Sequence, residues 1–198
     1  AELVDKLAAA GVVSITFDVV FSEPEPNMAT EIAAVHAAIP IAADLRQLAP
    51  QFDYDRRMAE SISKIDVTLG YILHGEGFRT GEMPASHVDL APELVQRSSV
   101  EHMVGHTTNI PVLQQTARGQ GFINGPPDSD GIVRRAPLML RYGDQLFPSL
   151  ALQTAMTYLL LDSVTPTVIN DGSAVYVQSI ELGDKLIHTD GKGQMLVP

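Results

Sequence analysis

The chain has 198 residues, of which 45% are hydrophobic and 19% charged, a size and composition typical of one globular domain with a sizeable core. Its 24 acidic residues outnumber its 13 basic residues, for a net charge of -11, which excludes a nucleic-acid partner because such a partner requires a concentrated basic surface. The chain contains no cysteine, which excludes disulfides and thiolate metal sites, and a disulfide-free chain suits the cytosol and the bacterial periplasm alike.

The N-terminal segment predicts a helix followed by a buried strand. Residues 2–10 have helical composition, and Gly11 stands where a glycine commonly ends a helix. Residues 12–20 are a nearly unbroken run of apolar, mostly β-branched side chains. Such a run predicts a strand that is covered on both faces.

A second helix and a second strand follow. Residues 53–65 carry apolar side chains at helical spacing, with Asp53 or Asp55 available near the N-terminus as a cap, and residues 66–73 form another apolar run. A strand, a helix and a strand joined by the usual right-handed crossover predict that the two strands are parallel neighbours. Residues 28–48 are predicted to be a helical insertion between them, broken at Pro40.

The middle of the chain predicts loops and short elements. Residues 74–109 are rich in Gly, His, Pro and Ser and are predicted to be a long functional loop region with one short helix at residues 92–97. A short helix is predicted at residues 111–117, and strands are predicted at residues 121–124 and 132–142.

The C-terminal part predicts one long helix and a β meander. The helix covers residues 147–161, and its apolar stripe consists of Leu150, Ala151, Thr154, Ala155, Tyr158 and Leu159. Short strands at residues 167–170, 174–177, 179–182 and 185–189 are separated by hairpin turn signals. The sequence therefore predicts a single α/β domain, residues 1–198, with a mixed sheet flanked by helices and a C-terminal antiparallel β meander.

Two patterns resemble metal sites, and both fail in detail. The Asp-Ser-Asp-Gly run at residues 128–131 resembles the start of an EF-hand loop, but aligning Gly131 with the invariant glycine puts prolines at two ligand positions. His102 and His106 have the spacing of a zinc pair on a helix, but no Glu follows His102 and Gly105 weakens a helix there. We therefore expect no metal and no cofactor.

Four polar residues are candidates for binding an unknown small molecule. Asp18 lies at the carboxyl end of the first predicted parallel strand, where open α/β sheets tend to bind ligands. His74 and Glu76 follow the second strand and are predicted to emerge from the same edge of the sheet, and Asn124 ends a further strand. The alternative for Asp18 is structural, as a helix cap or as an acceptor of loop amides.

Arg134 and Arg135 are adjacent on a predicted strand and should therefore point to opposite faces. Arg134 shares the more apolar face, so it is predicted to be buried in an ion pair with Asp130 or Asp128, the alternative being an anchor for an anionic ligand. On that hypothesis Arg134→Ala should cost about 3 to 5 kcal/mol and Arg135→Ala under about 1 kcal/mol.

Several stretches resemble the type-two CHASE domain, a sensory extracellular domain associated with cyclases and histidine kinases. The family's opening strand resembles residues 15–24, Ile-Thr-Phe-Asp-Val-Val-Phe-Ser-Glu-Pro. Its Gly-Phe-Ile-Asn-like strand resembles residues 121–124, and its Asp-x-Asp-Gly-x-x-Arg-Arg run resembles residues 128–135, with Asp128, Asp130, Gly131, Arg134 and Arg135 as the motif. A Pro-Ser-Leu-Ala helix start resembles residues 148–151. The resemblance covers nearly the whole chain, in order.

The resemblance implies the periplasmic or extracellular portion of a bacterial inner-membrane receptor, with a cyclase, a histidine kinase or a Ser/Thr kinase as output domain. It implies that this chain has no catalytic activity, that flanking segments outside it meet the membrane, and that the intact receptor is a homodimer. Because the sequence starts at Ala1 and stops on an apolar run, we expect a piece of a longer protein whose two ends lie near one another and face the membrane.

Two other functions stay open from the sequence. One is a soluble enzyme domain that uses Asp18 with a loop histidine as an acid–base pair, and the other is a purely structural dimerisation module. A pocket near Asp18 would favour a binding or catalytic domain, and a filled sheet edge would favour the structural module.

Overall fold

The computed structural model describes residues 1–125 and 130–197. The helices are α1 (Glu2–Ala9), α2 (Met28–Val35), α3 (Ile41–Leu48), α4 (Tyr54–Ile62), α5 (Pro92–Gln96), α6 (Pro111–Gln114) and α7 (Leu150–Tyr158), with a 3-10 turn η1 (Ala49–Phe52). The strands are β1 (Ser14–Phe17), β2 (Asp66–His74), β3 (Arg79–Thr80), β4 (His102–Met103), β5 (Gly105–Thr107), β6 (Gly119–Phe122), β7 (Arg135–Pro137), β8 (Met139–Tyr142), β9 (Gln145–Pro148), β10 (Thr165–Asn170), β11 (Val175–Leu182), β12 (Lys185–Gly191) and β13 (Gln194–Leu196). The predicted α/β class with mixed sheets is confirmed.

β2 is the central strand of the N-terminal sheet. It pairs in parallel with β1 and β6, and its last residues pair in antiparallel with β5, which pairs in turn with β3. The prediction that the first two strands are parallel neighbours is confirmed. The prediction that residues 12–20 form a strand buried on both faces is wrong, because β1 has only four residues, is mostly half-buried and pairs, among the described residues, with β2 alone.

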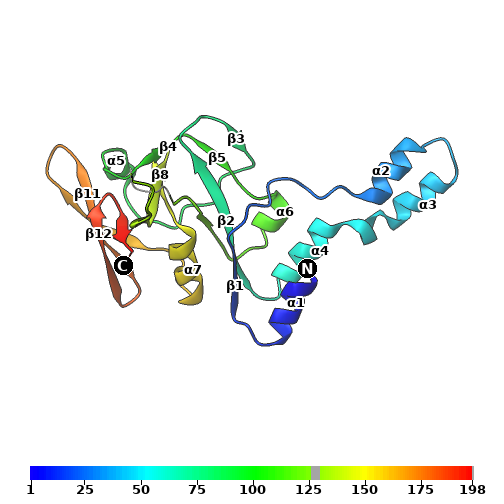
Figure 1. The fold of residues 1–198 in the computed structure, drawn as a ribbon, viewed down its shortest axis with the longest axis horizontal. Coiled ribbons are helices and arrows are strands. Elements are labelled where there is room, and N and C mark those ends of the chain that lie inside the picture. Colours follow the sequence, from blue (N-terminus) through cyan, green and yellow to red (C-terminus); the bar gives the residue numbers. More distant parts are fainter. Residues whose placement is uncertain (126–129, 198) are drawn as a thin grey trace.

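α7 packs between this sheet and the C-terminal core (Figure 1). The backbone of α7 approaches β6 closely, since a Cβ atom added at Gly121 would lie 2.5 Å from Leu150 Cα. The predicted helix is confirmed over residues 150–158. The prediction of which side of this helix is buried is wrong, because the predicted apolar stripe is not the buried face. The buried residues of α7 are Leu152, Gln153, Met156 and Thr157, whereas Tyr158 is 65% exposed.

The C-terminal meander is confirmed as the antiparallel sheet β10-β11-β12. Two of the predicted strands, residues 174–177 and 179–182, are joined in the single strand β11. Val177, Ile180 and Leu182 of β11 belong to the apolar core that also contains Leu152 and Met156 of α7. The turn before β11 is held by Asp171, whose carboxylate accepts hydrogen bonds from the backbone N–H groups of Ser173 at 2.8 Å and Ala174 at 2.9 Å.

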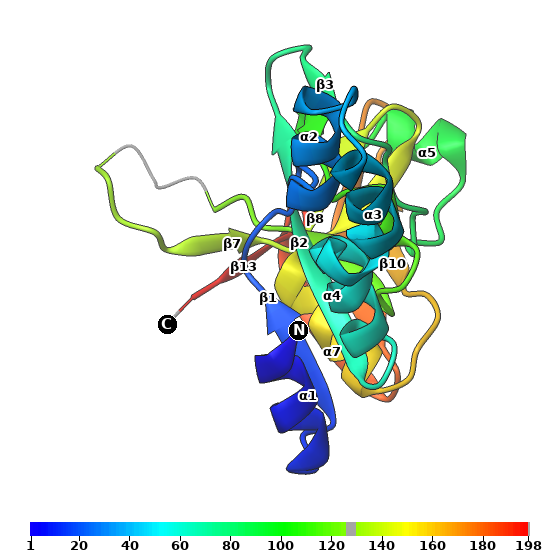
Figure 2. The ribbon, with the colours of Figure 1, turned by 90° about the vertical axis from the view of Figure 1, so that its right-hand side faces the viewer.

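The predicted strand at residues 132–142 is divided in two. β7 pairs with β13 in a two-stranded ribbon, and β8 pairs with β4 and β9 in a separate sheet. Figure 2 shows the paired strands β7 and β13 at one side of the molecule. In Figure 1 and in Figure 2, α1 lies apart from β13. The expectation that the two ends lie near one another is therefore not met.

Residues 28–48, predicted to be helical, form α2 and α3, which lie side by side and project from the body as a helical arm (Figure 1). The base of this arm is closed by the side-chain amide of Asn27, which donates a hydrogen bond to the Ala49 carbonyl at 2.8 Å. Asn27 also caps α2 by accepting from the Thr30 backbone N–H. Of the two residues predicted to cap the following helix, α4, it is Asp53 that does so, by accepting a hydrogen bond from the Arg56 backbone N–H.

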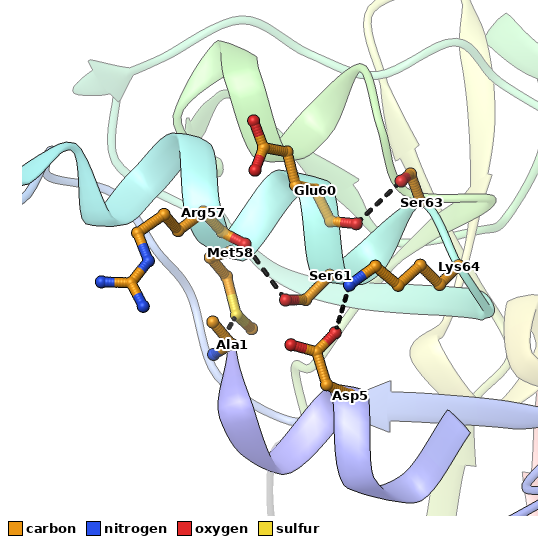
Figure 3. A network of polar contacts seen from close by, with 8 residues as sticks. All are labelled: Ala1, Asp5, Arg57, Met58, Glu60, Ser61, Ser63 and Lys64. Carbon is orange, nitrogen blue, oxygen red and sulfur yellow. Dashed lines mark hydrogen bonds and ion pairs between the residues drawn. The ribbon is translucent and has the colours of Figure 1, made fainter. Parts of the chain in front are cut away.

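α1 is attached to the C-terminal end of α4 by polar contacts (Figure 3). Lys64 Nζ lies 2.7 Å from the Asp5 carboxylate, and this hydrogen bond holds the pKa of Asp5 below its usual range. Ser61 lies at the same junction, almost fully buried, and its hydroxyl donates to the Arg57 carbonyl. Within the described part of the chain, no helix has the length and apolarity that a membrane-spanning helix needs.

Candidate functional site

Asn124 lies at the carboxyl end of β6 and pairs with the backbone of β2. Its side-chain amide donates to the Leu73 carbonyl at 2.8 Å, and its side-chain oxygen accepts from the Leu73 N–H at 3.0 Å. These two bonds continue the backbone pairing of β6 beyond Phe122, where Ile123 N–H donates to the Tyr71 carbonyl. Asn124 was predicted to bind a ligand, and its amide is engaged in holding the end of the sheet.

Two cavities adjoin Asn124 and Gly125, and together they form what we call the carboxyl-end cleft. The first, of about 310 Å³, is lined also by Glu101, Met103 and Leu140. The second, of about 220 Å³, lies between β6, the start of α7 and the β7–β13 ribbon, and its lining includes Val133, Arg135, Leu150 and Met195. The position agrees with the rule that α/β sheets bind ligands beyond the carboxyl ends of their strands.

Asp18 is exposed and follows β1 directly. The chain beyond it crosses over β2 at Gly70, where an added Cβ atom would lie 3.0 Å from the Phe17 carbonyl oxygen and 3.2 Å from that of Val19. The space beside this crossing is filled by Asn109, a fully buried residue that donates to the Gly70 carbonyl at 2.9 Å and accepts from the Phe21 N–H at 2.9 Å. Sequence reasoning missed Asn109, because nothing local marks a loop asparagine as the partner of β2 and of the distant segment that follows β1.

His74 and Glu76 do emerge from the end of β2, but they lie away from Asp18. His74 lies four residues beyond Gly70 in β2, and four residues of extended strand span about 13 Å. Its Nε2 lies 2.9 Å from the Thr107 hydroxyl, and its ring packs on Phe78 with centroids 4.0 Å apart. Neither Asp18, His74 nor Glu76 lines the carboxyl-end cleft as the described residues form it.

The two histidines considered for zinc do not share a helix face. His102 is in β4 and exposed, whereas His106 is in β5 and only 5% exposed. The His106 ring lies 3.2 Å from the Tyr142 hydroxyl on one side and 3.2 Å from the Gly81 carbonyl oxygen on the other. Among the residues that the structure describes, no three His, Asp or Glu side chains are grouped as a metal site.

The Asp-Gly-x-x-Arg-Arg motif forms an exposed turn. Arg134 contacts the two carboxylate oxygens of Asp130 through two nitrogens, each at 2.8 Å, and Asp130 also accepts from the Ile132 N–H. The contact with Arg134, and to a lesser extent that with the Ile132 N–H, holds the pKa of Asp130 below its usual range. Gly131 has the left-handed φ of +82° that the turn requires. Asp128 lies outside the described residues.

The prediction of an ion pair between Arg134 and Asp130 is confirmed, and the prediction that Arg134 is buried is wrong. The side chain of Arg134 is 46% exposed, because β7 begins only at Arg135 and residues 132–134 precede it. Arg135 is exposed as well. Since exposed ion pairs contribute little to stability, the large loss expected for Arg134→Ala no longer follows, and both arginine variants should melt close to the wild type.

Comparison with known families identifies the chain. The model of the CHASE2 domain matches residues 1–198, so the chain belongs to the CHASE2 family over its whole length. CHASE2 domains are sensory extracellular domains of signalling receptors. The resemblance read from the sequence motifs is thereby confirmed. Searches among curated proteins and among solved structures gave no match.

Proposed function

We propose that this chain senses a small molecule or an envelope condition on the outer side of a bacterial membrane and passes that information to a cyclase, a histidine kinase or a Ser/Thr kinase. The observation that carries the proposal is the family match over every residue of the chain. In this proposal the domain itself catalyses no reaction. Its ligand acts by binding one of two conformations more tightly than the other.

The carboxyl-end cleft is the proposed sensing site. Its second cavity is lined by Ser149 and Leu150, at the start of α7, and by Met195 of β13. A molecule bound there would contact β6, α7 and the β7–β13 ribbon together, and α7 in turn packs on the C-terminal core. A ligand in the cleft could therefore bias how these elements pack on one another.

The geometry supports binding over acid–base catalysis. An acid–base pair must reach one reacting atom, with each group within hydrogen-bond distance of the proton it transfers. The chain at Asp18 lies beside Gly70, about 13 Å of extended strand before His74, and His74 Nε2 is engaged with the Thr107 hydroxyl of β5. The proposed ligand-binding roles of Asp18, His74 and Glu76 therefore rank below that of the cleft at Asn124.

A substitution that fills the cleft tests the proposal. Gly125 lines both cavities, and a Cβ atom added there meets no atom of the described residues within 4 Å, so we expect Gly125→Phe to occupy the cleft and to keep the fold. Gly77→Phe is the matched control, since Gly77 is equally open. A panel of sugars, amino acids, amines and organic acids would be screened by thermal shift. We expect a stabilising compound to lose its effect in Gly125→Phe and to keep it in Gly77→Phe.

The same two variants test the signalling role in the full-length receptor. The output activity should respond to the stabilising compound in the wild type and in Gly77→Phe, and this response should be lost in Gly125→Phe. Equal stabilisation of all three proteins would place the binding site elsewhere. An output that ignores a compound bound in the cleft would contradict the sensing function.

A further inference from the structure

The helical arm formed by α2 and α3 has its small residues inside. Ala29 and Ala33 of α2 are 3% and 0% exposed, and Ala42 of α3 is 1% exposed. Alanine faces allow the two helices to approach closely, but they bury little apolar surface. The arm therefore gains little stability from its own interior.

The large apolar side chains of α2 point outward. Met28, Ile32 and Val35 are 52%, 42% and 79% exposed, and they follow one another at spacings of four and three residues. This is the spacing of a coiled-coil seam, in which such residues lie in one stripe along a helix and pack into a facing helix. α2 thus carries a seam with no partner in its own chain among the described residues.

α3 repeats the same pattern. Ile41, Leu45 and Leu48 are again four and three residues apart, with Ile41 53% and Leu48 41% exposed and Leu45 half-buried. Both helices of the arm therefore present Met, Ile, Val or Leu stripes on the outside of an alanine interior. A globular helix normally has the opposite arrangement, with its large apolar side chains facing the core.

The body of the protein does not cover these stripes. The arm projects away from the sheets (Figure 1), and the three apolar core clusters of the described chain include no residue of 28–48. The arm is attached at its base, where Asn27 binds the Ala49 carbonyl. The exposed stripes are thus available to a partner on a surface that stands clear of the rest of the molecule.

The low charge of the arm favours a second copy of this chain as that partner. Residues 28–48 carry Glu31, Asp44 and Arg46, a net charge of -1, whereas the whole chain carries -11. Two copies that met through their arms would therefore bring only a small part of the chain's negative charge together.

We propose that the α2–α3 arm is a homodimer interface, in which the arms of two copies pack their Met/Ile/Val/Leu stripes together as a four-helix bundle about a twofold axis. The interface would bury the stripes that the single chain leaves exposed. This proposal does not rest on the sensing function, because the oligomeric state is measured without a ligand.

Sedimentation equilibrium of the 198-residue chain tests the proposal. The wild type should form dimers, and the double variant Ile32→Glu/Val35→Glu should raise the dissociation constant at least about tenfold, since four glutamates would then meet in one apolar interface. Both positions are exposed in the single chain, so circular dichroism should show an unchanged monomer fold. Tyr158→Glu is the control, because Tyr158 is 65% exposed on α7, outside the arm.

Cysteine cross-linking provides an independent measurement. The chain has no cysteine, so a single introduced thiol reports only on its own position. Ile32→Cys or Val35→Cys should form disulfide-linked dimers under mild oxidation, and Tyr158→Cys should not. A wild type that stays monomeric up to about 500 µM, or a dimer that the double variant leaves intact, would overturn the proposal.

Discussion

Tyr71 is a fully buried residue of β2 whose hydroxyl has no hydrogen-bond partner among the described residues. It lies in an apolar cluster with Leu73, Phe122 and Leu140, and this burial raises its pKa far above the ordinary value for tyrosine. A buried hydroxyl without a partner loses its bonds to water and gains none in return. We therefore expect the Tyr71 hydroxyl to contribute nothing to the stability of the fold.

We predict that Tyr71→Phe leaves the free energy of unfolding unchanged or raises it by up to about 1 kcal/mol. Tyr142→Phe is the matched control, because the Tyr142 hydroxyl lies 3.2 Å from His106 Nδ1, and its loss should lower the free energy of unfolding by about 1 kcal/mol. Urea unfolding of the two variants measures the difference. A clear destabilisation by Tyr71→Phe would show that the hydroxyl has a partner.

Asp171 makes the β10–β11 turn dependent on pH. The hydrogen bonds that its carboxylate accepts, from Ala174 above all and then from Ser173, hold the pKa of Asp171 below its usual range. A group whose pKa is lower in the folded state than in the unfolded state stabilises the fold above the unfolded pKa. That stabilisation is lost as the pH falls through the folded pKa.

Asp171→Asn should therefore destabilise the protein near neutral pH, since the amide is a weaker acceptor and carries no charge. The difference in urea midpoint between wild type and variant should persist down to about pH 4 and shrink as the pH falls further. Urea titrations at a series of pH values from about 6 to about 2.5 would check this. A difference that stays constant over the whole range would contradict the assignment.

At the scale of elements, the contact between α7 and β6 depends on glycine. A Cβ atom at Gly121 would lie 2.5 Å from Leu150 Cα and 2.6 Å from its backbone nitrogen. Backbone atoms of a helix start do not move aside as a side-chain end does, so the whole of α7 would have to shift. The parallel strand β6 is thereby held directly against the first turn of the helix.

Gly121→Ala should lower the free energy of unfolding by about 1 to 3 kcal/mol, which is the usual cost of overpacking. In Gly77→Ala, by contrast, the new methyl group meets no atom within 4 Å, and the change should stay within about 0.5 kcal/mol. Thermal or urea unfolding followed by circular dichroism would compare the two. Equal effects would show that α7 can shift without cost.

The sequence predicted those elements whose local pattern agrees with their packing. The long apolar run of β2, the Asp53 cap of α4 and the turn signals of the C-terminal meander all led to correct elements. It failed on β3, β4 and β5, which have two or three residues each and too short a span for any periodicity. It also failed on the face of α7, because Gln153 and Thr157 are buried against a glycine-rich sheet that hydrophobicity does not reveal.

The candidate site was predicted only in part. The sheet-edge rule led to the end of the sheet where the carboxyl-end cleft lies, and Asn124 adjoins that cleft, while its role in binding a ligand stays a prediction. The other lining residues, such as Glu101, Leu140 and Met195, come from segments that meet only in the folded chain. The burial of Arg134 was predicted from the strand alternation of residues 132–142, and that alternation does not hold where the strand begins at Arg135.

At the scale of the whole molecule, the arm is separate from the three apolar clusters that stabilise the body. Replacing residues 28–48 by a short Gly/Ser linker should therefore leave the rest of the fold intact, since the Asn27 amide already lies 2.8 Å from the Ala49 carbonyl oxygen. The melting temperature, measured at low protein concentration, should fall by no more than about 4 °C. A loss of the far-ultraviolet signal of the sheets would show instead that the body depends on the arm.

The place of the arm in the chain also has a consequence for loop closure. β1 and β2 are adjacent strands, yet residues 18–65 separate them, and the arm makes up 28–48 of that connection. Because the entropy of closing a loop grows only with the logarithm of its length, the arm adds only about 0.5 kcal/mol to the cost of pairing these two strands. The sheet is thus almost indifferent to how long the arm is, and the arm can change its length and its outer side chains at little expense to the fold.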